Sequence, residues 1–350
     1  MARFRRARPA RSRRRLPEPR AALRRRRRRA GRRRPRGRSL RRLPLAEAVQ
    51  GPLVNRADGS LAVRAGLWRR LLGAGLLPRA LVTALGVPLL ALAAVQGGLV
   101  YRSLIGVLVL LGVREFLLLM SAKGYGPFKV IGTLAGLACA WAVAHGPAAA
   151  VPVLTAALMA VMTVELMRRN MDRSLNHVAV TLFGALYVGW LGGFLVLLRE
   201  LPDGAGADGF TGLRALALLA ALTWACDTLA FLVGVAVGRR PLLPRVSPRK
   251  SVEGAVGGIL GATGAGLVAA ATFAPFLSTL QGGLLGAVCG VTGQIGDLVE
   301  SMLKRDAGIK DTAALLPGHG GILDRFDSLL FNAPVVYYAL ILTGAATVAR

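Results

Sequence analysis

The chain has 350 residues, of which 54% are hydrophobic, and its mean hydropathy is +0.52. Its 46 lysines and arginines outnumber its 17 acidic residues, so its net charge is +29. Because a soluble domain is rarely so apolar and so basic at once, these values exclude a soluble enzyme, a coiled coil and a mainly disordered chain. They indicate an integral membrane protein with a separate basic segment.

The basic segment comes first in the chain. Residues 1–42 contain 22 arginines and a single acidic residue, Glu18, so the remaining residues carry a net charge of only +8. We expect residues 1–75 to form a disordered, Arg-rich cytoplasmic tail. Attraction to anionic lipid is one alternative role for it. Nucleic acid is a disfavoured partner, because Phe4 is the only aromatic residue in 1–42 on which a base could stack.

Long apolar runs follow the tail. A transmembrane helix needs about 20 mainly apolar residues, and the runs are continuous rather than alternating, which favours helices over barrel strands. The sequence therefore predicts an all-α integral membrane protein, a polytopic bundle of about nine transmembrane helices. The expected spans are 80–96, 99–120, 129–145, 149–167, 177–198, 213–238, 254–278, 281–300 and 329–348.

The charges between these spans predict an orientation. Lysine and arginine accumulate on the cytoplasmic side of membrane proteins. With the N-terminus inside, the expected inside loops contain 14 such residues and the outside segments contain four, namely Arg102, Arg199, Arg214 and Arg350. The sequence therefore predicts an N-in/C-out topology with its most charged loops in the cytoplasm.

Acidic residues interrupt two of the apolar runs. Asp227 lies in the run 213–238, and Asp297 lies in the run 281–300. A carboxylate is expensive inside a bilayer, so each needs a partner or a function. An intramembrane ion pair is one alternative, but two such acids near charged cytoplasmic loops favour a functional site.

The segment 294–328 is the most charged part of the apolar region. Its acids are Asp297, Glu300, Asp306, Asp311, Asp324 and Asp327, and its bases are Lys304, Arg305, Lys310, His319 and Arg325. Carboxylates supply oxygen ligands for Mg²⁺, while lysines and arginines neutralise phosphate oxygens. The pattern indicates a site for a divalent cation with a polyphosphate. The absence of a GxxxxGK[ST] sequence argues against an ATPase motor.

The stretch 301–327 resembles the signature of phosphatidate cytidylyltransferases, also called CDP-diacylglycerol synthases. The residues that carry the resemblance are Ser301, Lys304, Arg305, Lys310, Asp311, Leu316, Pro317, His319, Gly320, Gly321, Asp324, Arg325 and Asp327. A second similar block contains Trp224, Asp227, Thr228, Gly238, Arg239, Ser247, Pro248, Arg249, Lys250, Ser251, Glu253 and Gly254. A weaker third block covers 114–116 and 123–127. The sequence departs from the family at Leu229, Phe231 and Val252, which leaves details of substrate contact open.

The resemblance implies a reaction in which CTP and phosphatidic acid give CDP-diacylglycerol and pyrophosphate. It implies a multi-pass protein of the bacterial inner (plasma) membrane, with a cytoplasmic site, Mg²⁺ with K⁺ as a second cation, contact with membrane lipid, and a homodimer. We expect N-terminal transmembrane helices over 76–200 and a C-terminal catalytic region over 201–350, with cytoplasmic loops 239–253 and 301–328.

Site residues follow from the resemblance by motif position. Asp297 and Asp324 would be the metal ligands. The catalytic site around them would be lined by Asp227, Lys250, Lys304, Arg305, Lys310, Asp311, His319, Arg325 and Asp327. Substrate would contact Arg239, Ser247, Glu253, Ser301, Gly320 and Gly321.

Two other functions remain open from the sequence. A CTP-dependent lipid kinase would transfer the γ-phosphate and release CDP. An ion or solute transporter would use Asp227 and Asp297 as coupling sites, but it would not need the charged segment 301–327, and no inverted repeat is evident.

Overall fold

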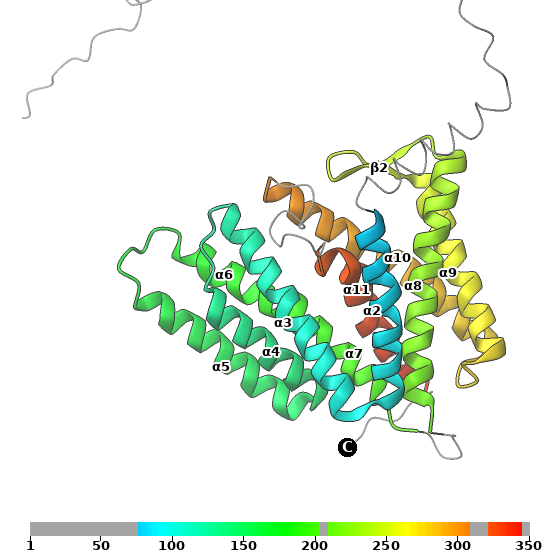
Figure 1. Cartoon of the computed structure of the whole chain (residues 1–350), viewed down its shortest axis with the longest axis horizontal. Coiled ribbons are helices and arrows are strands. Elements are labelled where there is room, and N and C mark those ends of the chain that lie inside the picture. The colour runs from blue at the N-terminus through cyan, green and yellow to red at the C-terminus, as the bar shows by residue number, and fades with distance from the viewer. Residues whose placement is uncertain (1–75, 204–208, 309–320, 345–350) are drawn as a thin grey trace, which may run out of the picture. The chain divides into compact units, whose positions relative to one another are not determined.

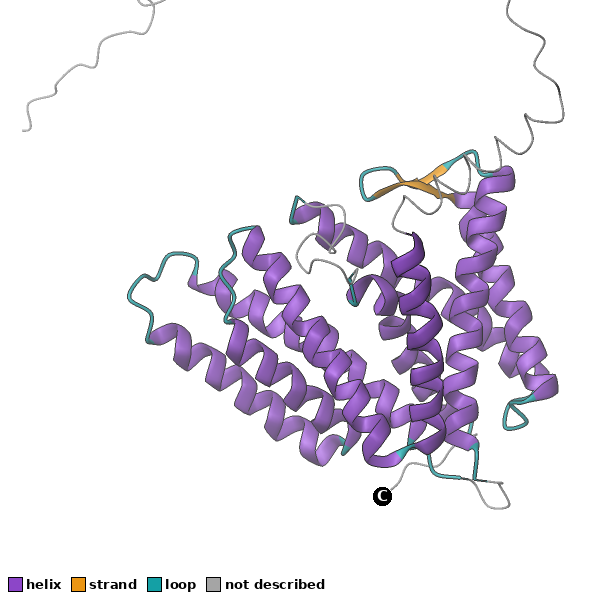
Figure 2. Ribbon diagram, in the orientation of Figure 1, coloured by secondary structure: helices purple, strands orange, loops and turns teal. Residues whose placement is uncertain are grey.

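The computed structural model describes residues 76–203, 209–308 and 321–344, and their side chains from residue 85 onward (Figure 1). The helices are α2 (Leu76–Gln96), α3 (Gly98–Ala122), α4 (Lys129–Ala144), α5 (Pro147–Leu166), α6 (Ser174–Gly184), α7 (Leu191–Arg199), α8 (Thr211–Val237), α9 (Val252–Thr272), α10 (Thr279–Asp306) and α11 (Leu323–Leu342). A π-helical segment, η1 (Ala185–Trp190), joins α6 to α7. The strands β1 (Pro241–Leu243) and β2 (Ser247–Ser251) form an antiparallel hairpin between α8 and α9, visible in Figure 2.

The helical membrane character predicted from the sequence is confirmed. Within the described residues, six helices are long and apolar enough to cross a membrane, counting α6, η1 and α7 as one helix. The others of this kind are α3, α5, α8, α9 and α10. The apolar helix α4 is shorter, and α11 begins with charged residues. The number nine therefore stays a prediction, as does the division at residue 200. The tail 1–75 lies outside the described residues.

The two ends of the expected cytoplasmic loop 301–328 are helical. Helix α10 continues to Asp306, and α11 begins at Leu323. Basic residues Lys304 and Arg305 lie in the last turn of α10, and the acidic Asp324 lies in the first turn of α11. These charges oppose the partial charges at the helix ends and so stabilise them. The expected loop 239–253 likewise holds the hairpin and the first turn of α9.

Glycines let α9 and α10 pack backbone against backbone. A Cβ atom added to Gly266 would lie 2.0 Å from the carbonyl oxygen of Gly282, and one added to Gly286 would lie 2.2 Å from that of Ala262. Only glycine fits such contacts, and close approach of this kind is a common means of helix association in membranes. It brings the hairpin before α9 near the polar end of α10.

A polar network joins α8, α10 and α11 inside the bundle. The amide of Asn332, which is fully buried, donates to the hydroxyl of Thr223 at 3.0 Å, and its oxygen accepts from the hydroxyl of Thr292 at 2.6 Å. Each buried polar group of this trio is thereby satisfied. The network fixes the relative rotation of the three helices that carry the acidic residues of the predicted site.

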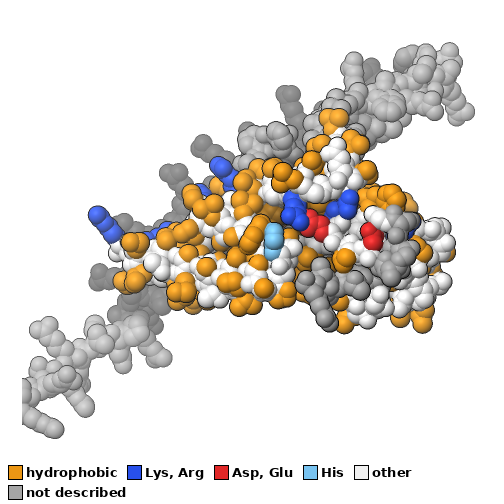
Figure 3. All heavy atoms as spheres, turned by 90° about the horizontal axis from the view of Figure 1, so that it is seen from below, with side chains coloured by type: hydrophobic (Ala, Val, Ile, Leu, Met, Phe, Trp, Pro, Cys, Tyr) orange, Lys and Arg blue, Asp and Glu red, His pale blue; other side chains and the backbone are white. Residues whose placement is uncertain are grey.

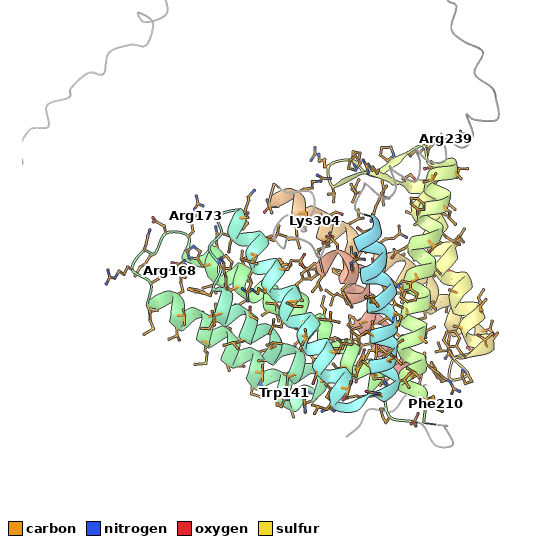
Figure 4. The ribbon with its side chains drawn as sticks, in the orientation of Figure 1. Trp141, Arg168, Arg173, Phe210, Arg239 and Lys304 are labelled. Atoms are coloured by element: carbon orange, nitrogen blue, oxygen red, sulfur yellow. The ribbon has the colours of Figure 1, made fainter. Side chains whose placement is uncertain are left out.

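The two ends of the bundle differ in charge. Arg168, Arg173, Arg239 and Lys304 lie toward the end that carries the hairpin, whereas Trp141 and Phe210 lie at the opposite end (Figure 4). That opposite end, seen in Figure 3, is largely hydrophobic with few charged side chains. The alternation of the helices thus places the loops 123–128, 167–173 and 238–251 at one end of the bundle.

Candidate active site

The first charged group of the site joins the hairpin to α10. The ammonium of Lys250, in β2, forms an ion pair with the carboxylate of Asp297, in α10. The hydroxyl of Ser301, one turn later, donates to the other oxygen of that carboxylate at 3.5 Å. Both charged side chains are about one third exposed. The pair is therefore held in place but open to a ligand.

The second charged group joins α10 to α11. The ammonium of Lys304 lies 2.7 Å from a carboxylate oxygen of Glu300 and 2.7 Å from one of Asp324. Glu300 is 3% exposed, and its second oxygen has no hydrogen-bond partner among the residues that the structure describes. One lysine therefore lies between two acidic side chains from α10 and α11. The sequence did not single out Glu300, although it lies one helical turn before Lys304.

Two further carboxylates surround the first group. Asp227 of α8 interacts electrostatically with Asp297 and Lys250, and so does Asp327 of α11. Asp327 also accepts a hydrogen bond from the backbone N–H of Ser328 at 2.6 Å. Three helices thus each bring one aspartate toward a single lysine, and repulsion among them favours a bound cation.

Gly296 allows α10 and α11 to come this close. A Cβ atom at Gly296 would lie 2.6 Å from the carbonyl oxygen of Asp327 and 3.0 Å from the ring of Phe331. Since real Cβ atoms do not approach an oxygen so closely, a larger residue would push the helices apart. The glycine directly before Asp297 therefore sets the separation of Asp297 from Asp327.

The start of α11 is fixed by an acid from the N-terminal half of the chain. Glu115 of α3 is fully buried, and one carboxylate oxygen accepts from the backbone N–H of Ile322 at 2.7 Å and of Leu323 at 3.3 Å. A carboxylate at a helix N-terminus satisfies free N–H groups and opposes the helix dipole. It holds Asp324 in position from a distance of more than 200 residues in sequence. The sequence placed Glu115 only in the weaker third block, 114–116, and did not indicate that it caps the helix of the site.

The hairpin carries the remaining basic residues of the second block. Glu253 accepts from the backbone N–H of Arg239 at 3.0 Å and of Arg240 at 3.2 Å, so it closes the base of the hairpin. The guanidinium of Arg305 donates to the carbonyl oxygen of Val246 at 3.3 Å. Ser247 opens β2 opposite Leu243. Arg305 and Glu253 thus act in this structure as braces of the hairpin, and Arg239 remains exposed.

A tyrosine that the sequence did not indicate points toward the carboxylates. Tyr187 lies in the π-helical segment η1 and is 4% exposed. Its hydroxyl has no hydrogen-bond partner among the described residues, and it interacts electrostatically with Glu300, Asp327 and Asp297. Its ring packs against Phe116, Phe183 and Phe331. Single π-helical turns are frequent at functional sites, but nothing in the sequence marks one here.

The remaining site residues predicted from the sequence lie partly outside the described structure and partly near the start of α11. Lys310, Asp311, His319 and Gly320 lie outside the described residues. Gly321 is buried just before α11, and Arg325 is exposed in its first turn. The structure thus places Asp227, Lys250, Asp297, Ser301, Lys304, Asp324 and Asp327 around the junction of β2, α8, α10 and α11.

The carboxylate oxygens of the site suit a cation such as Mg²⁺. In the described part of the chain, no three acidic, histidine or cysteine residues converge as a preformed metal cage. Mg²⁺, however, usually takes one or two protein carboxylates and completes its shell with water and substrate phosphates. Asp297 and Asp324 each have one oxygen bound to lysine, and Glu300 shares Lys304 with Asp324. The residues present therefore fit a cation that arrives with an anionic substrate.

Comparison with known proteins identifies the family. The sequence pattern of the cytidylyltransferase family matches residues 78–343. The chain belongs to this family. The match covers most of the described structure and includes the residues of the candidate site.

Named relatives of this cytidylyltransferase come from bacteria and plants. The chain is 34% identical over 287 residues to a phosphatidate cytidylyltransferase of Synechocystis, covering 75% of this chain and 96% of that protein. It is 33% identical to phosphatidate cytidylyltransferase 5 of Arabidopsis thaliana chloroplasts, over 71% of this chain and 67% of the plant protein. It is 38% identical to the phosphatidate cytidylyltransferase of Bacillus subtilis, over 48% of this chain and 60% of that protein.

Proposed function

We propose that this cytidylyltransferase transfers CMP from CTP to phosphatidic acid, giving CDP-diacylglycerol and pyrophosphate. The similarity to a phosphatidate cytidylyltransferase over 96% of that relative's length carries the proposal. The clustered lysines and carboxylates at one end of a helical membrane bundle support it. They suit two phosphorylated substrates, one of which is anchored in lipid.

The reaction needs little acid–base chemistry. An oxygen of the lipid phosphate forms a bond to the α-phosphorus of CTP, while the bond from that phosphorus to the bridging oxygen of pyrophosphate breaks. A phosphate monoester has a second pKa near about 6, so the attacking oxygen is largely deprotonated at neutral pH. The protein must therefore align the two phosphates and neutralise charge, as in other phosphoryl transfers.

We assign the alignment and the charge neutralisation mainly to the two charged groups of the site, which we call the lysine groups: one contains Lys250 and Asp297, and the other contains Lys304, Glu300 and Asp324. Asp297 and Asp324 would hold Mg²⁺, with K⁺ as a second cation, to supply positive charge for the phosphate groups. Lys304, Arg305 and Lys310 would bind the departing pyrophosphate. Arg239, Lys250 or Arg325 would bind the lipid phosphate. Because Lys250 and Lys304 already contact the carboxylates, each is held within reach of a phosphate bound there.

We propose the orientation of the protein in the membrane from the different charges of the two ends of the bundle. We place the hairpin end in the cytoplasm, where CTP is available, with nine spans and an N-in/C-out topology in a bacterial inner (plasma) membrane. The lipid headgroup lies at the same surface. A homodimer, which the resemblance implies, remains part of the proposal.

Transfer of label tests the reaction. Purified protein would be given phosphatidic acid, Mg²⁺ and CTP labelled at the α-phosphorus. We expect label in the lipid fraction and an equal amount of pyrophosphate. CDP with unlabelled lipid would instead establish a CTP-dependent lipid kinase, and intact CTP with a folded protein would contradict both enzymes.

Asparagine variants test the metal assignment. D297N and D324N keep the size of the side chain but remove the charge that would hold Mg²⁺. We expect each to lower kcat at least about 100-fold and to raise the Mg²⁺ concentration for half-maximal rate. Near-normal turnover with unchanged Mg²⁺ dependence in D324N would refute the assignment.

A further inference from the structure

A groove on the outer face of α3 and α4 is separate from the charged groups of the site. Its volume is about 480 Å³, and it is lined by Leu110, Arg114, Leu118, Lys129, Val130, Thr133, Leu134 and Leu137. The two helices lie side by side in Figure 1. Five apolar side chains and two cations thus share one open surface, with no acidic residue in its lining.

Close packing of α3 on α4 forms the floor of this groove. Cβ atoms added to Gly132 and Gly136 would lie 2.9 Å from Leu117 and 2.7 Å from Val113. The glycines therefore let the helices touch along their inner faces. Beside this contact, Val130 is 76% exposed and Leu134 is 58% exposed, so both face the surroundings of the bundle.

One of the two cations of the groove, Arg114, lies well inside a helix long enough to span the membrane. Arg114 lies eight residues before the end of α3, a rise of roughly 12 Å along the helix. Lys129 is the first residue of α4. Both are exposed, and neither side chain has a hydrogen bond or ion pair with another described residue. A guanidinium in a membrane-spanning helix is costly unless an anion or water reaches it.

We propose that this groove binds one anionic phospholipid of the surrounding membrane. Its phosphate would lie between Arg114 and Lys129, and an acyl chain would follow Leu110, Leu118, Leu134 and Leu137. Charge complementarity favours this occupant, because Arg114 and Lys129, neither of them paired with another described residue, share a surface that is otherwise mainly apolar. A free nucleotide or inorganic phosphate would leave the apolar wall uncovered.

Native mass spectrometry of the full chain tests the proposal. Delipidated protein would receive equal amounts of dioleoyl phosphatidylglycerol and dioleoyl phosphatidylcholine, at high salt so that attraction by the arginine tail is screened. We expect one phosphatidylglycerol to be retained preferentially. R114Q/K129Q should weaken that retention about 10-fold, because two lipid-facing charges are lost.

Two matched variants control for charge and folding. R169Q/R173Q removes two exposed cations outside the groove and should retain the lipid like the unmodified protein. R114K/K129R keeps both charges and should also retain it. Equal retention by R114Q/K129Q, or equal loss in R169Q/R173Q, would overturn the proposal. So would a change of oligomeric state in R114Q/K129Q with phosphatidylglycerol retention unchanged, because the groove would then join two copies of the chain.

Discussion

Two buried tyrosines of this structure differ in what their hydroxyl groups contact. Tyr187 and Tyr101 are both buried tyrosines in membrane helices. The hydroxyl of Tyr101 donates to the carbonyl oxygen of Leu195 at 3.2 Å, whereas that of Tyr187 faces carboxylates without a partner among the described residues. The first contact holds helices together. We expect the second hydroxyl to donate to a phosphate or water that binds beside these carboxylates.

Removal of the Tyr187 hydroxyl should therefore lower activity, and removal of the Tyr101 hydroxyl should lower stability. We expect Y187F to lower kcat/KM about 10-fold with an unchanged melting temperature, because only a bond to substrate is lost. Y101F should lower stability by about 1 kcal/mol and leave kcat/KM unchanged. Steady-state kinetics and thermal unfolding in detergent would measure both. Normal kinetics in Y187F would assign its hydroxyl no part in the reaction.

Lys304 balances a buried charge. Its removal deletes the ammonium that contacts Glu300, which is 3% exposed, and Asp324. We expect K304M to lose about 3 kcal/mol of stability, as when one partner of a buried ion pair is deleted. K123M is the matched control, because the side chains of the Lys123–Asp306 pair are 38% and 46% exposed and the pair should contribute below about 1 kcal/mol.

Thermal unfolding of the two lysine variants would distinguish them. Adding E300Q to K304M should restore part of the lost stability, because the uncompensated buried charge is then removed. Equal melting temperatures of K304M and K123M would show that Lys304 is no more important for folding than a surface lysine.

At the scale of elements, contacts between helices decide where the acids lie. Helix α10 meets α9 through glycines on one side and meets α11 at Gly296 on another. Glu115 of α3 holds the first turn of α11 from a third direction. The site therefore depends on three helix contacts, each of which includes a residue that the sequence analysis did not assign to the site.

Gly296 tests the importance of this packing. G296A places a methyl group 2.6 Å from the carbonyl oxygen of Asp327, so α11 must move away from α10. We expect a loss of about 1–3 kcal/mol of stability, as for other overpacked cores, and a fall in activity. In G264A the added methyl meets nothing within 4 Å, so that variant should be neutral or up to about 1 kcal/mol more stable.

Thermal unfolding and label transfer on both glycine variants would check this. Retention of full activity by G296A would mean that the separation of Asp297 from Asp327 is not set by this contact.

At the scale of the whole molecule, the two ends of the bundle have different chemistry. The hairpin end carries most of the basic loops, and the opposite end is largely hydrophobic (Figures 3 and 4). This asymmetry is the physical basis of the proposed orientation, because positively charged loops stay in the cytoplasm. It puts the lysine groups and the proposed nucleotide on one membrane side.

Cysteine labelling in intact cells would test the orientation. Cys139, Cys226 and Cys289 are buried, so the background reaction should be low. We expect F210C to react with a membrane-impermeant maleimide from outside, and R173C to react only after the cells are opened. The reverse pattern would place the lysine groups outside and contradict cytoplasmic synthesis from CTP.

The sequence by itself determined the class of the protein and its family. In lipid, the backbone N–H and C=O groups of a long, continuous apolar run can form their hydrogen bonds within a helix. The helical bundle was therefore predictable from local composition. The charged stretch 301–327 likewise pointed to its family, because the residue types and their spacing are local properties. Helix ends were less predictable: Asp306 and Asp324 belong to helices that continue past the apolar residues.

Only the tertiary structure decided which charges meet. Lys250 and Asp297 are 47 residues apart, and Glu115 reaches Ile322 across 207 residues. Tyr187 joins the site through a π-helical turn in an otherwise ordinary apolar helix. Such contacts depend on the rotation and separation of packed helices, which glycines such as Gly296 set through backbone approach. Hydropathy and charge spacing carry no information about that geometry, so the fold had to supply it.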